Sequence, residues 1–212
     1  MKVITILAQK GGTGKTTLSI HLAAVAAGRN RKVVIADTDP QASATVWKQR
    51  REKSSPDVML STIQALKEEW AAITASGVKL LIIDTPPHST DDATIAAGMA
   101  DLVLIPSRPA ILDLAAIGDS VAIVRDVGKP GAIVLNCCPP PTRFGETAIV
   151  QEARSALDVY DLLVAPVAIS QRAAFSHALI DGRAVTEFEK KGKAAGEISQ
   201  LWKWVNKELS RG

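Results

Sequence analysis

The chain has 212 residues, of which 47% are hydrophobic and 22% are charged, and its formal net charge is +3 at pH 7. These values are ordinary for a soluble globular protein, and the length is most simply one domain, residues 1–212, with a sizeable core. Aromatic residues make up only 4% of the chain, which argues against base stacking as a main binding mode, and no apolar run approaches the ~20 residues that span a bilayer.

Cysteine usage and the first residues bear on the compartment. The two cysteines, Cys137 and Cys138, are adjacent, so they form neither a disulfide framework nor a C-x-x-C pair. Met1 and Lys2 lead directly into the first predicted strand, so we expect no signal peptide. We therefore expect a cytoplasmic protein, and the mildly basic balance permits contact with DNA or a membrane surface without demanding either.

Apolar runs that predict strands alternate with helical patterns along the whole chain. The strands are expected at residues 3–8, 32–36, 58–60, 79–83, 102–105, 132–135 and 162–164, mostly as continuous runs typical of strands covered on both faces. Helices are expected at residues 15–28, 42–51, 63–75, 90–97, 112–127, 146–157 and 194–209. This alternation predicts an α/β three-layer sandwich with a mostly parallel, doubly wound central sheet, whose binding site lies at the carboxyl ends of the strands.

The first strand is followed by a glycine-rich loop with the sequence Gln9-Lys10-Gly11-Gly12-Thr13-Gly14-Lys15-Thr16-Thr17, and then by a helix. Strand, glycine loop, Lys-Thr and helix together have the layout of the phosphate-binding loop of P-loop NTPases. Glycines let successive backbone N–H groups point at one anion, and the positive end of the helix faces the same phosphates. Lys15 is expected to reach the β- and γ-phosphates of ATP, and the Thr16 hydroxyl to hold Mg²⁺. We assign nucleotide binding to every residue from Gly11 to Thr17.

This loop has two other interpretations. It could be a plain glycine turn with solvated lysines. It could also be a dinucleotide fingerprint, since Gly12-x-Gly14 is followed by Asp37 at a suitable distance. The second interpretation fails because Thr17 stands where the third glycine belongs, and because Lys-Thr serves a triphosphate.

Three carboxylates follow predicted strands at places where a triphosphate site needs them. Asp37 and Asp39 come just after the second strand, and Asp84 ends the apolar run Leu80-Leu81-Ile82-Ile83. One such carboxylate can support Mg²⁺ and its waters while another positions the attacking water. Alone, the Asp37–Asp39 segment could equally be a helix cap and a turn.

Because Gln9 replaces the first glycine of the strict loop pattern, the loop is a deviant version of it. The run from Lys10 to Thr16 closely resembles the deviant Walker A loop of the ParA/MinD group of ATPases. The Asp37-x-Asp39-Pro-Gln segment and the Walker B aspartate Asp84 then follow in the order used by that group. The resemblance implies that Lys10 reaches the nucleotide of a partner subunit, that Asp39 activates water, and that Asp37 and Asp84 lie near the metal.

Other segments resemble the same group less specifically. Pro106-Ser107-Arg108-Pro109, followed by Asp113, resembles a P-S-x-x-D segment at the dimer face, although it could be a plain turn and helix start. Asn136 stands where the group places an asparagine on the adenine edge, which a side-chain amide can recognise as both donor and acceptor. It could also be an ordinary turn residue. Backbone groups near Pro166 are expected to complete the base pocket.

Basic residues collect in the last third of the chain. In the ParA branch such residues hold DNA without sequence preference, through phosphate contacts that weaken with salt. The resemblance therefore implies DNA binding, and we assign it to Arg172, Arg183, Lys190 and Lys191. A solvated helix face is the alternative, because glutamates interrupt the lysines.

The last predicted helix carries Ile198, Leu201, Trp202, Val205 and Leu209 on one stripe. We expect this stripe to lie in the core. A membrane-binding amphipathic helix, as in the MinD branch, is the alternative.

Taken together, the resemblance implies a small ParA-type partition ATPase. Such a protein would bind ATP and Mg²⁺, form a homodimer, hold non-specific DNA at the nucleoid, and hydrolyse ATP slowly until a ParB-like or small centromere-binding activator stimulates it. Its task would be plasmid or chromosome partition, or cargo positioning. The alternatives are a membrane-cycling ATPase of the MinD type, a metabolic P-loop enzyme, and a nucleotide-dependent polymer; we do not expect a membrane partner.

Overall fold

The computed structural model describes residues 1–28 and 31–211. Seven parallel strands form one sheet in the order β3-β2-β4-β1-β5-β6-β7. The strands are β1 (Lys2–Ile6), β2 (Val33–Asp37), β3 (Asp57–Leu60), β4 (Leu80–Asp84), β5 (Leu102–Ser107), β6 (Gly131–Leu135) and β7 (Leu163–Val164). All seven predicted strands are present, and the predicted doubly wound α/β class is confirmed. Every residue of β2, β4, β5 and β6 is buried, which explains why these strands are continuous apolar runs.

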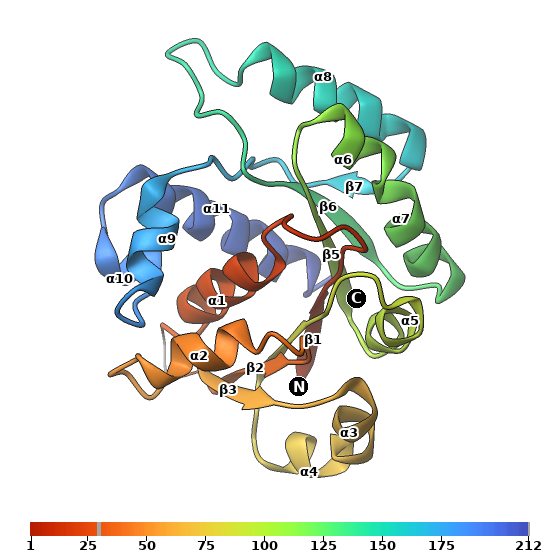
Figure 1. Cartoon of the computed structure of the whole chain (residues 1–212), viewed down its shortest axis with the longest axis vertical. Coiled ribbons are helices and arrows are strands. Elements are labelled where there is room, and N and C mark those ends of the chain that lie inside the picture. The colour runs from red at the N-terminus through yellow and green to blue at the C-terminus, as the bar shows by residue number, and fades with distance from the viewer. Residues whose placement is uncertain (29–30, 212) are drawn as a thin grey trace.

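Helices cover both faces of the sheet (Figure 1). One layer holds α1 (Lys15–Ala26), α2 (Ser43–Gln49), α9 (Ala173–Leu179), α10 (Val185–Phe188) and α11 (Lys193–Glu208). The other holds α3 (Ile63–Glu68), α4 (Trp70–Ala75), α5 (Thr90–Gly98), α6 (Ile111–Ala115), α7 (Ile117–Asp126) and α8 (Ala148–Leu157). The 3₁₀ turn Asp158–Tyr160 follows α8.

The structure differs from the predicted helices in three respects. The helix expected at 63–75 is interrupted at Glu69, and the one expected at 112–127 is interrupted at Ala116, where ψ in each case is close to zero. Helices α9 and α10 were not predicted, because seven and four residues are too few to show a clear helical period. The expected first helix extends to residue 28, whereas α1 ends at Ala26.

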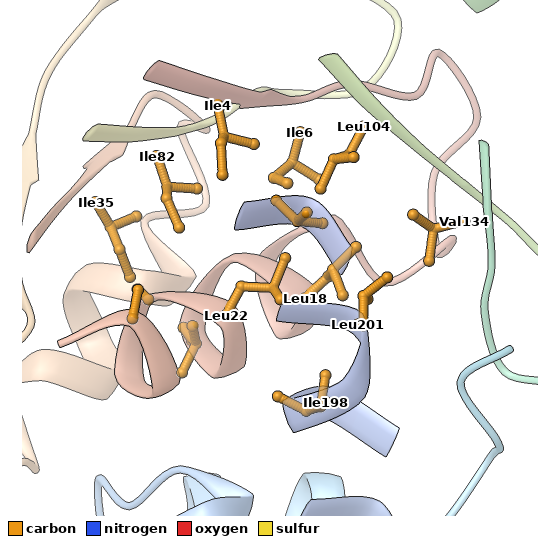
Figure 2. Packing of buried hydrophobic residues seen from close by; sticks show 14 of the residues in the cluster. Ile4, Ile6, Leu18, Leu22, Ile35, Ile82, Leu104, Val134, Ile198 and Leu201 are labelled. Carbon is orange, nitrogen blue, oxygen red and sulfur yellow. The ribbon is translucent and has the colours of Figure 1, made fainter. Parts of the chain in front are cut away.

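The largest hydrophobic cluster lies between the sheet and the layer that contains α1 and α11. Figure 2 shows Leu18 and Leu22 of α1 pointing toward Ile4 and Ile82 of the sheet, with side chains of α11 packed beside them. Ile198, Leu201, Val205 and Leu209 are buried and Trp202 is half-buried against the same cluster, so the prediction that this stripe belongs to the core is confirmed except for the partial exposure of Trp202. Its apolar face is thus already used in packing. None of the helices within residues 1–28 and 31–211 is long and apolar enough to cross a membrane.

Candidate nucleotide-binding site

The glycine loop joins the end of β1 to the start of α1 at the carboxyl edge of the sheet. Gly12 and Gly14 have φ values of 72° and 89°, a left-handed backbone that glycine adopts without strain. Leu18 donates its backbone N–H to Gly14 as α1 begins, but the N–H groups of residues 11–17 find no acceptor among the residues that the structure describes. A row of free N–H groups at a helix N-terminus is a binding site for an anion.

Side chains from two neighbouring strands hold the outer face of this loop. The Asn136 amide, just after β6, donates to the Thr13 carbonyl at 2.7 Å. The Arg108 guanidinium, just after β5, donates to the Gly12 carbonyl. A Cβ atom on Gly14 would lie 2.4 Å from Asn136 Nδ2, so the close approach of the two residues requires glycine.

Lys15 lies inside the loop rather than in solvent. Its side chain is buried, and Nζ donates to the Ala8 carbonyl at 3.1 Å. Burial lowers the pKa of Lys15, while the nearby carboxylates of Asp84 and Asp39 oppose that shift. The ammonium group thus lies close to two of the three predicted functional carboxylates, Asp84 and Asp39.

Asp37 and Asp84 face each other across neighbouring strands. They are partners in the parallel register of β2 and β4, and both are fully buried. Asp37 Oδ2 accepts two hydrogen bonds of 2.8 Å from Thr45, one from the backbone N–H and one from the hydroxyl. Ser19 donates its hydroxyl to Asp84 Oδ1 at 3.1 Å. The second oxygens, Asp37 Oδ1 and Asp84 Oδ2, have no partner among the described residues.

Burial dominates the electrostatics of Asp84. It raises the pKa of this carboxyl to about 7; repulsion from Asp37 adds to the increase, and hydrogen bonds from Thr16 and Ser19 and the charge of Lys15 oppose it. An unpartnered buried carboxylate oxygen is costly unless a cation or donor satisfies it. Two such oxygens, beside the Thr16 hydroxyl, form a set of hard oxygen donors that fits hydrated Mg²⁺. Among the described residues no group of three or more His, Cys, Asp or Glu could hold a metal ion by itself.

The other two predicted catalytic residues lie at the rim of the site. Asp39 is partly exposed, and its Oδ1 accepts the backbone N–H of Gln41 at 2.9 Å. Lys10 forms an ion pair with Asp113 of α6, with 3.1 Å between Nζ and Oδ1. In this structure the loop's first lysine is therefore bound to a carboxylate of its own chain.

A cavity of about 240 Å³ opens beside the start of α1. Its walls include Gly14, Thr17 and Leu18 on one side and Asn136 and Phe175 on the other. Apolar walls with a few polar groups suit a nucleoside. Asn136 lines this cavity as expected, but Pro166 does not: it is exposed, and its carbonyl accepts a hydrogen bond of 3.4 Å from Arg154.

The four residues predicted to bind DNA have different surroundings. Arg172 lines the cavity and is paired with Glu197 at 2.8 Å, so its guanidinium is not free on the outer surface. Arg183 is paired with Asp181 at 2.6 Å and stacks on Phe188. Lys190 and Lys191 are exposed, and neither has a carboxylate within 4.0 Å among the described residues. The lysines match the prediction better than the arginines.

Sequence reasoning missed three side chains that support the site. Ser19 and Thr45 bond the two buried carboxylates, and Arg108 bonds the loop. Ser19 lies one helical turn after Lys15, which is the spacing that places both on one face of α1. Neither the contact of Thr45 with Asp37 nor that of Arg108 with Gly12 follows from sequence spacing, because each depends on how the chain folds in three dimensions.

A parallel α/β sheet with a glycine loop, a buried lysine and two buried aspartates at its carboxyl edge defines the class of P-loop nucleotide-binding proteins. The chain belongs to the CobQ/CobB/MinD/ParA nucleotide binding domain family, whose model matches residues 4–183.

Two relatives are informative. Maintenance of carboxysome distribution protein A of Gloeobacter kilaueensis is 32% identical over 214 residues, covering 99% of this chain and 94% of that protein. Protein ParA of Rhizobium radiobacter is 28% identical and covers 59% of this chain and 57% of that protein.

Solved structures agree with the fold. A substituted form of Cyanothece McdA in complex with ATP superposes with a TM-score of 0.74 at 17% identity, covering 99% of this chain and 96% of that one. The septum site-determining protein MinD of Pyrococcus horikoshii, complexed with Mg-ADP, gives a TM-score of 0.78 at 17% identity and covers 97% and 96% of the two chains.

Proposed function

We propose that this protein is a ParA-type switch ATPase that binds ATP and Mg²⁺, dimerises, holds non-specific DNA in the ATP state and releases it after hydrolysis, and so positions a cargo. The observation that carries the proposal is the row of N–H groups at residues 11–17, free of acceptors in the described part of the chain. The same loop carries Lys15, whose ammonium lies near Asp84, and Asp37 and Asp84 each have one buried oxygen that the described residues leave unpartnered. Anion donors and cation acceptors side by side match a metal-bound triphosphate.

The residues of the site divide between the parts of the nucleotide. The loop N–H groups and Lys15 bind the β- and γ-phosphates, and the cavity beside Asn136 takes the base. Thr16, Asp37 and Asp84 would hold the magnesium ion, directly or through water, and the ion would offset phosphate charge. ATP and Mg-ADP in the solved structures named above support this assignment.

Asp39 is the residue proposed to orient the attacking water. It is partly exposed, it lies near Lys15, and among the described residues its carboxylate accepts a bond only from the backbone of its own turn. Because such hydrolysis depends on positioning and electrostatics, a group supplied by an activator can change its rate by orders of magnitude. We therefore expect slow basal hydrolysis and stimulation by a ParB-like or small centromere-binding partner.

Dimerisation requires Lys10 to change partners. Here it pairs with Asp113 of its own chain. In the proposed dimer each Lys10 leaves Asp113 and contacts the phosphates bound by the other subunit, where a charge-assisted bond to phosphate replaces the partly exposed ion pair.

The relatives support the biological setting. The names of the carboxysome distribution protein and of ParA favour cargo positioning or partition, and the proposal places this task in the cytoplasm, at the nucleoid. DNA contact through Lys190 and Lys191, helped by Arg183, and a single functional unit over residues 1–212 are parts of this proposal.

The central test compares Lys15→Ala with wild type. Wild type should bind a fluorescent ATP analogue with Mg²⁺ and hydrolyse ATP slowly, whereas Lys15→Ala should lose at least about tenfold in affinity because a buried charge-assisted contact is removed. Lys67→Ala, which removes an exposed lysine of α3, is the matched control and should behave as wild type. ATP turnover by Lys15→Ala at the wild-type rate would refute the site.

Asp39→Ala separates binding from hydrolysis. The variant should bind ATP as wild type does and accumulate as a dimer in size-exclusion chromatography, because its phosphate contacts are intact and its water is unpositioned. A DNA-retention assay with ATP, ADP and no nucleotide, run beside liposomes, then identifies the surface it binds. Retention on liposomes alone would favour the membrane-cycling alternative.

A further inference from the structure

Two consecutive carbonyl groups of the glycine loop are held by side chains that follow strands β5 and β6. Arg108 donates to the Gly12 carbonyl, and the Asn136 amide donates to the Thr13 carbonyl at 2.7 Å. The peptide bond that follows each carbonyl is trans, so its N–H points in the direction opposite to the carbonyl. A bond to the Gly12 carbonyl therefore fixes the direction of the Thr13 N–H, and a bond to the Thr13 carbonyl fixes that of the Gly14 N–H.

The order of the strands shows which way these two N–H groups face. Strands β5 and β6 lie on one side of β1, and β4 and β2 lie on the other. Because the carbonyls are held toward the β5–β6 side, the N–H groups of Thr13 and Gly14 face the β4 side. That is the side of Asp84, beside which the Lys15 ammonium lies. Neither N–H has an acceptor within residues 1–28 and 31–211, so both can donate to an anion there.

The backbone around Arg108 keeps its side chain in this position. Arg108 precedes Pro109, and a residue before proline is restricted to extended backbone. The Asn136 N–H donates to the Ser107 carbonyl at 2.7 Å, so the two residues that hold the loop are tied to each other through their backbones. Arg108 has no carboxylate within 4.0 Å in the described part of the chain, which leaves its charge to strengthen the bond to Gly12.

We propose that Arg108 is a positioning residue for phosphate binding, which holds the Gly12 carbonyl outward so that the Thr13 N–H donates to the nucleotide. Asn136 does the same for the Gly14 N–H, in addition to its expected contact with the base. Glycine is conformationally permissive, so without the guanidinium the peptide after Gly12 can rotate and turn its carbonyl oxygen toward the phosphate. This inference rests on the proposed function, because it needs a phosphate in the loop.

The first test measures the affinity of Arg108→Ala for a fluorescent ADP analogue with Mg²⁺. Affinity should fall at least about tenfold, because a charge-assisted bond is lost and one phosphate donor is no longer oriented. Arg125→Ala is the matched control, since Arg125 is also an exposed arginine that donates to a backbone carbonyl, that of Tyr160. It makes the same change in net charge and should stay within about twofold of wild type. Equal losses in the two variants would overturn the proposal.

Amide proton shifts separate positioning from a general effect of charge. In ¹⁵N-labelled wild type saturated with Mg-ADP, the Thr13 and Gly14 amide protons should move downfield as they donate to phosphate. In Arg108→Ala the Thr13 proton should lose this shift while the Gly14 proton keeps it, and Asn136→Ala should give the converse. If each variant reduced both shifts alike, neither side chain would orient a particular peptide, and the inference would be wrong.

Free guanidinium ion supplies a further readout that a merely structural role would not produce. Millimolar guanidinium should restore Mg-ADP binding to Arg108→Ala, whereas sodium chloride at the same ionic strength should not; equal effects of the two salts would count against the proposal. Thermal unfolding checks the fold, and Arg108→Met, which keeps the apolar stem, replaces the alanine variant if that one does not fold. Failure of the proposed function is a different result, since wild type would then bind no Mg-ADP. Binding by wild type with equal affinity in Arg108→Ala would overturn this inference alone.

Discussion

At the scale of single residues, the site depends on how closely backbones approach one another. Gly14 combines a left-handed backbone with a neighbour, Asn136, that leaves no room for a Cβ atom. The glycines and Lys15 could be assigned from the sequence because the pattern of strand, glycine loop, Lys-Thr and helix is specific to phosphate binding. Arg108 could not, since its contact with the Gly12 carbonyl joins positions 96 residues apart.

Gly14→Ala should therefore have two effects: it strains the backbone, and it disturbs the contact of Asn136 with the loop. Alanine in a left-handed conformation costs about 1–2 kcal/mol, and here it also displaces Asn136 and releases the Thr13 carbonyl. We expect at least about a tenfold loss in nucleotide affinity, measured by fluorescence titration.

Gly77→Ala is the matched control for that substitution. Gly77 has a similar φ of 80°, but no described atom lies within 4 Å of the position its Cβ would take. The change should lower the free energy of unfolding by about 1–2 kcal/mol and leave nucleotide affinity unchanged. Equal affinities for the two alanine variants would show that contact with Asn136 is unimportant.

At the scale of elements, the hydrophobic pattern predicted the buried face of the long helix α11 but not the short helices beside it. Its apolar stripe, spaced three and four residues apart, predicted the buried face correctly. The short helices α9 and α10 escaped prediction because they are fixed by tertiary contacts, such as the bond from the Val185 N–H to His21 Nδ1. The breaks at Glu69 and Ala116 were missed for a similar reason, since no proline or glycine marks them.

Leu201→Ala tests the packing of α11 against the sheet. Leu201 is fully buried, so its truncation should lower the free energy of unfolding by about 2–5 kcal/mol in urea titrations. Gln200→Ala changes the neighbouring exposed position and should stay within about 0.5 kcal/mol of wild type. If both variants were equally stable, α11 would not contribute its stripe to the core in solution.

At the scale of the whole molecule, two buried groups act on stability in opposite directions as the pH falls. Asp84, whose pKa is raised to about 7 by burial, binds a proton first in the folded state and so adds stability below about pH 7, whereas His21 removes it below about pH 6.5. Burial lowers the pKa of His21 to about 4, although the Phe175 carbonyl and Glu187 oppose the shift. The unfolded chain therefore binds a proton first, and stability worth about 3 kcal/mol is lost between pH 6.5 and 4. Glu187 adds a second step: burial raises its pKa, but bonds from Arg51, Ala184 and Lys53 prevail and lower it to about 2, so stability is lost again from about pH 4.5 downward.

His21→Asn isolates the first step. Asparagine keeps an acceptor for the Val185 N–H but does not titrate, so the unfolding free energy of the variant should rise relative to that of wild type as the pH is lowered from 7 to 4.5. His177→Asn removes an exposed histidine of α9 and should leave the slope unchanged. An unchanged slope in His21→Asn would mean that His21 is not the group responsible.

The α/β fold class could be predicted from the alternation of strands and helices along the sequence. The order of the strands in the sheet could not. Each apolar run predicts a strand. Which strands become its neighbours in the sheet depends on the crossover connections and the packing of the helices. The carboxyl edge could be predicted as the place of the site because parallel strands end together.

The central place of β1 has a consequence for biosynthesis. Strand β1 leaves the ribosome ahead of its two partners, β4 and β5, which lie about 80 and about 100 residues further along the chain. At ~5–20 residues per second, this apolar strand waits roughly 5–20 s before either partner has been translated. The nascent chain is thus most exposed to aggregation before the nucleotide loop has any scaffold, which is the interval in which a chaperone would protect it.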